Sequence, residues 1–156
     1  MKLGIISGTG KEGKALAIRF GMYGHSIFIG SRSLDKAVII EKEIKLQLPK
    51  IDIKGSDYRN TVLEADIIFI ALPYHVVIDE LLNLKDVLKN KIIIDTSVPM
   101  IYNNGKFNRD STIKDSISTR NMTREEIANL NRGLIAHLPI TPHSGWISLG
   151  YAVFVP

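Results

Sequence analysis

A glycine-rich segment between an apolar run and an amphipathic run constrains this chain most. The apolar run Lys2–Ser7 predicts a β-strand, and the spacing of apolar residues over 15–20 predicts a helix. Between them lies a G-x-G-x-x-G pattern made of Gly8, Thr9, Gly10, Lys11, Glu12 and Gly13. Its first glycine permits a tight turn, the second lets the backbone approach a pyrophosphate, and the third lets helix and strand pack closely. The pattern therefore predicts a dinucleotide site at the start of the helix, where the dipole and unpaired N–H groups favour anions.

The same alternation continues to about residue 99. Further strands are predicted at Ser26–Gly30, Ile51–Ile53, Asp66–Leu72 and Lys91–Asp95, with helices over about 33–48 and 74–84. Alternating strands and helices indicate an α/β fold, namely a doubly wound, mostly parallel Rossmann sheet with helices on both faces. Beyond Pro99 we expect either a long surface loop or a poorly ordered segment over 102–125. A short helix is expected near 123–130, and two final strands are expected at 134–138 and 152–155.

Length and composition limit the classes of protein that this chain can belong to. A chain of 156 residues with 45% hydrophobic residues predicts one domain spanning 1–156. With no cysteine, disulfide scaffolds, iron–sulfur clusters and thiol nucleophiles are excluded. The apolar run at the N-terminus is too short for a signal peptide, and no stretch is long enough to span a membrane. We therefore expect a cytoplasmic protein.

The net charge of +4 is unevenly distributed. Residues 1–50 contain nine Lys and Arg against four Asp and Glu, whereas residues 51–156 contain eleven against twelve. The basic residues neither form a run nor alternate with aromatic residues, as a groove for nucleic acid would require. The charge therefore favours a small anionic ligand and argues against nucleic acid.

The end of the second predicted strand indicates which dinucleotide binds. NAD-binding domains usually place an Asp or Glu there for the ribose 2′-hydroxyl. This chain instead has Ser31 and Arg32, with Lys36 one helical turn later. A guanidinium, a hydroxyl and an ammonium group suit a 2′-phosphate, which predicts NADP(H) over NAD. The alternative is that Arg32 and Lys36 only solvate the start of a helix.

These residues resemble the N-terminal domain of the NADPH-dependent reductases of the 8-hydroxy-5-deazaflavin coenzyme. The resemblance covers residues 1 to about 100 and is most specific at Gly30-Ser31-Arg32. The other matching segments are Gly8 to Lys14, Gly24-His25, Lys36-Ala37, Ala65 to Ile68, Leu72-Pro73, Lys91 to Ile93, Val98-Pro99 and, more weakly, Ala136-His137.

The resemblance implies hydride transfer between NADP(H) and a deazaflavin or flavin. By position, residues 9–12 would contact the pyrophosphate, and Ser31, Arg32 and Lys36 would contact the 2′-phosphate. Leu72-Pro73, Val98 and Ala136 would lie at the ribose and nicotinamide. Direct hydride transfer requires positioning of two rings and no covalent nucleophile, so no catalytic acid or base is expected.

Two alternatives remain open from the sequence. The family has a C-terminal helical segment that covers the deazaflavin and supports dimerisation, and this segment is not expected in residues 1–156. The chain could therefore be a non-catalytic NADP-binding sensor or assembly module, and a homodimer would cover apolar surface near the ring site.

The histidines have less specific interpretations. His75, after Leu72-Pro73, is a candidate for orienting substrate or a surface residue at a helix start. The spacing of His137 and His143, without a nearby carboxylate, does not predict a metal site.

Overall fold

The computed structural model describes residues 1–97, 100–103, 106–109, 135–137 and 151–154. Its helices are α1 (Lys11–Met22), α2 (Leu34–Gln47), α3 (Tyr58–Glu64), the 3₁₀ helix η1 (Tyr74–Val76) and α4 (Val77–Asn83). Its strands are β1 (Lys2–Ile6), β2 (Ser26–Ser31), β3 (Ile53–Asp57), β4 (Ile67–Ile70), β5 (Ile92–Asp95), β6 (Met100–Asn103), β7 (Lys106–Arg109), β8 (Ile135–His137) and β9 (Tyr151–Phe154).

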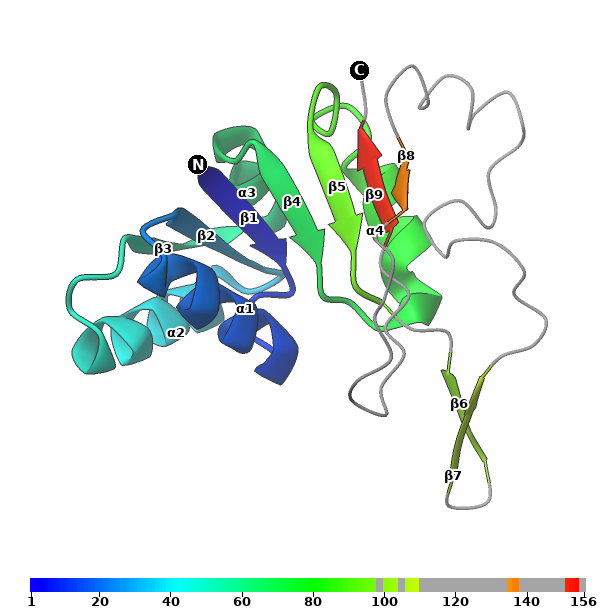
Figure 1. Ribbon diagram of the computed structural model, residues 1–156, viewed down its shortest axis with the longest axis horizontal. Helices are drawn as coiled ribbons and strands as arrows, with labels where there is room; N and C mark the ends of the chain where they lie inside the picture. Colours follow the sequence, from blue (N-terminus) through cyan, green and yellow to red (C-terminus); the bar gives the residue numbers. More distant parts are fainter. Residues whose placement is uncertain (98–99, 104–105, 110–134, 138–150, 155–156) are drawn as a thin grey trace.

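A sheet with the order β3-β2-β1-β4-β5-β9-β8 forms the centre of the molecule (Figure 1). The first five strands are parallel, whereas β9 runs antiparallel to both β5 and β8. The chain builds outward from β1 to β3 and then crosses back to place β4 on the other side of β1. In sheets of this kind, ligands bind beyond the carboxyl ends of the strands where the order reverses, here next to β1. The predicted doubly wound, mostly parallel α/β sheet is confirmed.

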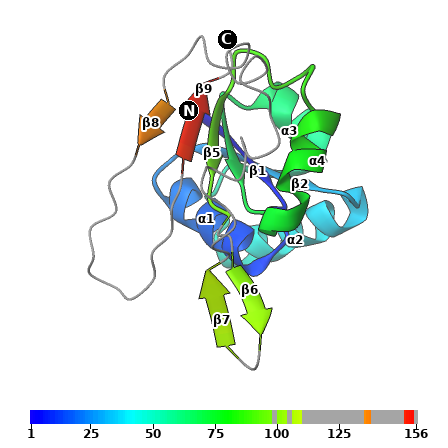
Figure 2. The same ribbon diagram turned by 90° about the vertical axis from the view of Figure 1, so that its right-hand side faces the viewer.

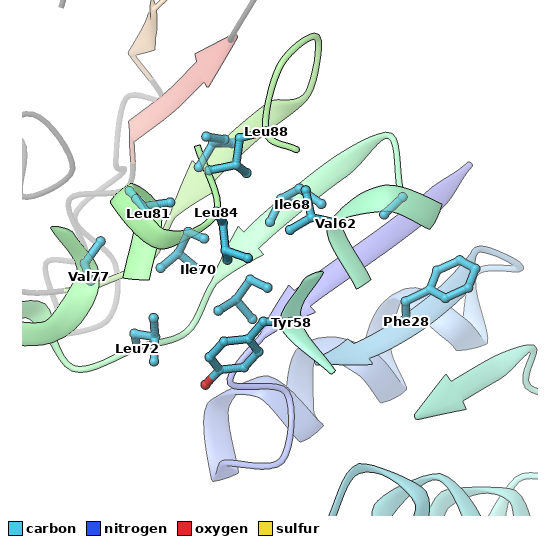
Figure 3. Close-up of a cluster of buried hydrophobic side chains, with 13 residues drawn as sticks. Phe28, Tyr58, Val62, Ile68, Ile70, Leu72, Val77, Leu81, Leu84 and Leu88 are labelled. Atoms are coloured by element: carbon cyan, nitrogen blue, oxygen red, sulfur yellow. The ribbon is translucent and has the colours of Figure 1, made fainter. Parts of the chain in front are cut away.

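Both faces of the five parallel strands are buried, as expected for parallel strands with apolar residues at most positions. On one face, Leu3 and Ile5 of β1 pack with Ala17 of α1 and Ile44 of α2. The other face joins strand residues to α3 and α4, which lie on the same side of the sheet (Figure 2). Figure 3 shows this second cluster, made of Ile6, Phe28, Tyr58, Val62, Ala65, Ile68, Ile70, Leu72, Val77, Leu81, Leu84, Leu88 and Ile93. Successive strand residues therefore supply two separate cores, one on each face of the sheet.

Several boundaries differ from the prediction. The third strand covers Ile53–Asp57 rather than 51–53, because pairing with β2 extends it through residues of low strand propensity. Helix α3 follows it directly; the alternation of strands and helices implied a helix here, but no residue range was predicted for it. The predicted loop over 102–125 is wrong at its start, since β6 and β7 pair as an antiparallel hairpin. The sequence Asn104-Gly105 between these strands favours a hairpin turn and was the overlooked signal.

The later predictions are confirmed only in part. β8 and β9 agree with the two final strands predicted at 134–138 and 152–155. The helix predicted near 123–130 lies outside the described residues. In the part of the chain that the structure describes, no helix is long and apolar enough to cross a membrane.

Candidate dinucleotide-binding site

The turn between β1 and α1 carries the glycine-rich segment and is bonded to β2. Gly8 donates its N–H to the carbonyl of Gly30 over 2.9 Å, and Gly10 donates to the carbonyl of Ser7 over 3.1 Å. The left-handed residue of this turn is Ser7, with φ of 65°. A non-glycine residue in that conformation costs roughly 1–2 kcal/mol, so the surrounding contacts must hold it in place.

The three glycines have different surroundings. A Cβ atom on Gly13 would lie 2.5 Å from the Gly8 Cα and 2.6 Å from the Ser7 carbonyl oxygen. A Cβ atom on Gly8 would lie 2.7 Å from a side-chain methyl carbon of Ile29. The nearest atom to a Cβ on Gly10 is the Ser7 oxygen at 3.5 Å, an ordinary contact. Gly8 and Gly13 therefore permit close packing, whereas Gly10 borders open space at the start of α1.

The N-terminus of α1 differs from those of the next two helices. Its N-cap is Gly10, with no side-chain hydrogen bond to the helix. In α2 the Ser33 side chain accepts from the N–H of Lys36, and in α3 the Asp57 side chain accepts from the N–H of Asn60. The first N–H groups of a helix have no acceptor within the helix. Of these three helices, α1 is the one without a side-chain cap, so its first N–H groups can bind an external anion.

The carboxyl end of β2 brings together a hydroxyl and two cations. Ser31 is buried, and its Oγ accepts the N–H of Ser33 over 3.2 Å, which leaves the hydroxyl hydrogen to donate. Arg32 follows at the surface, and Lys36 is exposed in the first turn of α2. These groups lie beside the glycine-rich turn, because Gly30 pairs with Ile6 at the end of β1. The arrangement provides charge-assisted donors for a phosphate.

The nearest carboxylate on the neighbouring strand is already engaged. Asp57 ends β3 opposite Ser31, and its two carboxylate oxygens accept from the backbone N–H of Asn60 over 2.8 Å and from the Asn60 side-chain amide over 2.6 Å. The backbone hydrogen bond is the main cause that lowers the pKa of Asp57 below its ordinary value of 3.8. Asp57 therefore acts as the cap of α3.

Replacing Asp57 with alanine should lower the free energy of unfolding by about 1 kcal/mol at neutral pH, because an N-cap is lost. Since the folded pKa is lowered, the stabilisation by Asp57 is fully present above pH 3.8 and is lost as the pH falls through the folded pKa. Urea unfolding of both proteins at pH 7 and at steps below pH 4 should show the difference shrinking. The exposed Asp52, replaced by alanine, is the control. A difference that stays constant with pH would contradict the assignment.

Two residues of this region were not singled out from the sequence. Tyr58 opens α3 and is 8% exposed. Burial raises its pKa, and the nearby side chains of Ser7 and Arg32 oppose that shift. No local pattern marks Tyr58, because only the pairing of β2 with β3 brings it to the site. Ser7 is adjacent to the glycine motif, but its left-handed backbone is not visible in the sequence.

The remaining predicted residues are distributed as follows. Thr9 is half-buried in the glycine-rich turn, and Lys11 and Glu12 are exposed at the start of α1. Leu72 is 8% exposed and belongs to the core, whereas Pro73 is exposed before η1. Ala136 lies on β8 and pairs with Ala152, and Val98 lies outside the described residues.

The carboxyl ends of β4 and β5 also hold polar groups. Asp95 is 2% exposed, and one of its carboxylate oxygens accepts from the N–H of Ser97 over 2.9 Å and from the Ser97 hydroxyl over 2.6 Å. Thr96 donates its hydroxyl to the Ile70 carbonyl over 2.8 Å, which joins the two strand ends. His75 is exposed at η1, next to this edge. Among the residues with described side chains, no three His, Asp or Glu residues cluster as metal ligands would.

Together, the sheet order and the glycine-rich turn define a Rossmann-type domain, and the basic end of β2 lies at the edge where domains of this class bind dinucleotides. A family model described as "NADP oxidoreductase coenzyme F420-dependent" matches residues 2–99. The chain belongs to this family, which confirms the resemblance found in the sequence.

Individual relatives agree with this assignment. The chain is 35% identical over 104 residues to the F420-dependent NADP reductase of Methanocaldococcus jannaschii, and 31% identical over 103 residues to that of Methanothermobacter marburgensis. Each match covers 64% of this chain and 46% of the relative. The chain thus spans about half the length of these relatives. A crystal structure from Arthrobacter sp. FB24, described as a candidate F420-dependent NADP reductase, superposes with a TM-score of 0.61 at 22% identity, over 75% of this chain and 54% of that one.

Proposed function

We propose that this chain binds NADP(H) at the carboxyl ends of β1 and β2 and exchanges a hydride between it and a deazaflavin coenzyme. Membership of the F420-dependent family and the names of its relatives support the reaction. The observation that carries the choice of NADP(H) is the end of β2. There Ser31 and the exposed Arg32 stand where NAD-binding domains carry an acidic residue, and Asp57 is engaged as a helix cap.

The residues present fit the dinucleotide. The backbone of residues 9–12 at the uncapped start of α1 would hold the pyrophosphate, with Gly10 leaving room for its approach. Ser31, Arg32 and Lys36 would hold the 2′-phosphate. Leu72-Pro73, Val98 and Ala136 are proposed for the ribose and nicotinamide region.

NADPH, when bound, supplies the hydride, and the protein supplies binding and orientation. Strand pairing and the hydrogen bond from Thr96 to the Ile70 carbonyl join the ends of β4 and β5, and the Ser97 hydroxyl is bonded to Asp95. Holding two rings in a reactive arrangement contributes to the rate by replacing an encounter in solution. This role requires no nucleophile from the chain.

Two titrations test the proposal. NADPH is added first and binding is followed by its fluorescence, and oxidised 8-hydroxy-5-deazaflavin coenzyme is then added while its absorbance is recorded. We expect saturable NADPH binding, followed by loss of the absorbance of the oxidised coenzyme. The same assay with a flavin shows whether the acceptor can be a flavin. Failure to bind NADPH would overturn the assignment of the site.

The second candidate function is an NADP-binding sensor or assembly module without turnover. The confinement of the family match to residues 2–99 favours it. Tight NADPH binding with no reduction of either the deazaflavin or a flavin would support this module and would reject the enzyme.

We also propose that the protein is a homodimer in the cytoplasm. Light scattering after size-exclusion chromatography tests the dimer, which should have twice the chain mass of 17.4 kDa.

A further inference from the structure

Tyr58 joins the two phosphate-binding segments of the proposed NADP(H) site. β2 and β3 are parallel, with Ser31 opposite Asp57, so the next residues, Arg32 and Tyr58, leave neighbouring strands at the same edge of the sheet. Arg32 and Tyr58 are separated by 25 residues of chain, but the register of β2 and β3 places them at neighbouring strand ends. Among the residues whose side chains the structure describes, Tyr58 is the one aromatic residue at a strand end next to Arg32.

The ring of Tyr58 is fixed by packing. Tyr58 is 8% exposed and belongs to the core between the sheet, α3 and α4 (Figure 3). A Cβ atom added at Gly30 would lie 3.2 Å from the Tyr58 Cδ1, so the ring lies directly over the end of β2. The buried ring brings the hydroxyl to one place, with little rotational freedom left to it.

The hydroxyl of Tyr58 has two polar neighbours. Burial raises the pKa of Tyr58, while hydrogen bonding with Ser7 lowers it and the negative charge of Glu80 raises it further. Arg32 lowers it through its positive charge and a hydrogen bond. The phenol is therefore protonated at neutral pH. Both contacts lower the pKa of Tyr58, so Ser7 and Arg32 each present a hydrogen-bond donor toward the phenol oxygen, which is the acceptor.

Ser7 connects this contact to the glycine-rich turn. Its backbone has the unfavourable left-handed φ of 65°, and its carbonyl accepts the N–H of Gly10. Tyr58 is thus influenced both by Ser7, in the turn proposed for the pyrophosphate, and by Arg32, the cation proposed for the 2′-phosphate. An exposed arginine has many rotamers, and fixing it before the ligand arrives reduces the entropy lost on binding.

We propose that Tyr58 is a positioning residue that holds Arg32, by its hydroxyl and through Ser7, in the orientation that recognises the ribose 2′-phosphate. The inference rests on the proposed NADP(H) site. It assigns to Tyr58 a part of the discrimination between NADPH and NADH, while the pyrophosphate contacts common to both cofactors do not depend on its hydroxyl.

The experiment measures dissociation constants for NADPH and NADH with the wild type and Tyr58→Phe, which keeps the ring and removes the hydroxyl. We expect the NADPH constant to rise roughly 5- to 20-fold and the NADH constant to change by less than about 2-fold. Tyr23→Phe is the matched control, because Tyr23 is 74% exposed at the end of α1. It should change neither constant.

A double-mutant cycle shows whether Tyr58 acts through Arg32. In an Arg32→Gln background, Tyr58→Phe should leave the NADPH constant nearly unchanged, because the positioned group is gone. A purely structural tyrosine would instead weaken both cofactors equally and lower the melting temperature, which would overturn the inference. An undiminished effect in the Arg32→Gln background would overturn it as well.

The outcomes separate this inference from the proposed function. If the wild type binds NADPH in preference to NADH but Tyr58→Phe preserves their ratio, only the role of Tyr58 is rejected. If the wild type shows no preference for NADPH, both the proposed NADP(H) site and the role of Tyr58 are rejected.

Discussion

Replacing Arg32 with aspartate is expected to weaken NADPH binding by about 100-fold or more while changing NADH binding by no more than a few-fold. The substitution removes a charge-assisted pair with the 2′-phosphate and puts a negative charge against it. NADH has no phosphate at that position and escapes the repulsion. Fluorescence titration with each cofactor measures the two dissociation constants.

Arg19→Asp is the charge-matched control, because Arg19 is exposed in the last turn of α1, away from the carboxyl ends of the strands. This variant carries the same change in net charge. A general electrostatic effect of the basic N-terminal third would weaken NADPH equally in both variants. Equal losses for NADPH and NADH in Arg32→Asp would show that Arg32 does not recognise the 2′-phosphate.

Gly13→Ala is expected to lower the free energy of unfolding by roughly 3 kcal/mol. The added Cβ would lie 2.5 Å from the Gly8 Cα and 2.6 Å from the Ser7 carbonyl oxygen, and both contacts are with backbone that cannot rotate away. Helix α1 must therefore shift away from β1, and binding of both cofactors should fall together. Urea unfolding measures the loss of stability.

Gly10→Ala gives the contrasting variant in the same turn. Its Cβ has only an ordinary contact at 3.5 Å, and its φ of −74° suits alanine, so stability should change by no more than about 1 kcal/mol. Because Gly10 borders the start of α1, the methyl group should still weaken both cofactors. A Gly13→Ala protein as stable as Gly10→Ala would disprove the close packing at Gly13.

Local sequence signals predicted the elements whose patterns are strong. β1 and β2 are short apolar runs bounded by glycine or polar residues, and α2 begins after Ser33, a residue that favours the N-cap. The same reasoning failed for β3, where Lys54, Gly55 and Ser56 have low strand propensity. Pairing with β2 outweighed that propensity. Helix α3 is only seven residues long, too short for a clear apolar period.

Some residues of the candidate site could likewise be found from the sequence, whereas others required the structure. The glycine pattern and the replacement of an acidic residue by Ser31 and Arg32 are continuous in the chain, so they could be read directly. Tyr58 could not, because its place beside Arg32 depends on which strand pairs with β2. The role of Asp57 as the cap of α3 also required the structure. From the sequence alone, a carboxylate at the end of a strand could equally have faced the ribose.

The sequence by itself determined the alternation of strands and helices, the glycine-rich turn and the basic residues that favour a 2′-phosphate. These features arise from residues close together in the chain, where backbone preference and side-chain period act locally. The tertiary structure alone decided which strand ends meet, that Ser7 rather than Gly8 takes the left-handed conformation, and that Tyr58 begins α3 beside the end of β2 that carries Arg32. Hydrogen-bond ladders and core packing between distant segments fix those positions, and no local pattern encodes them.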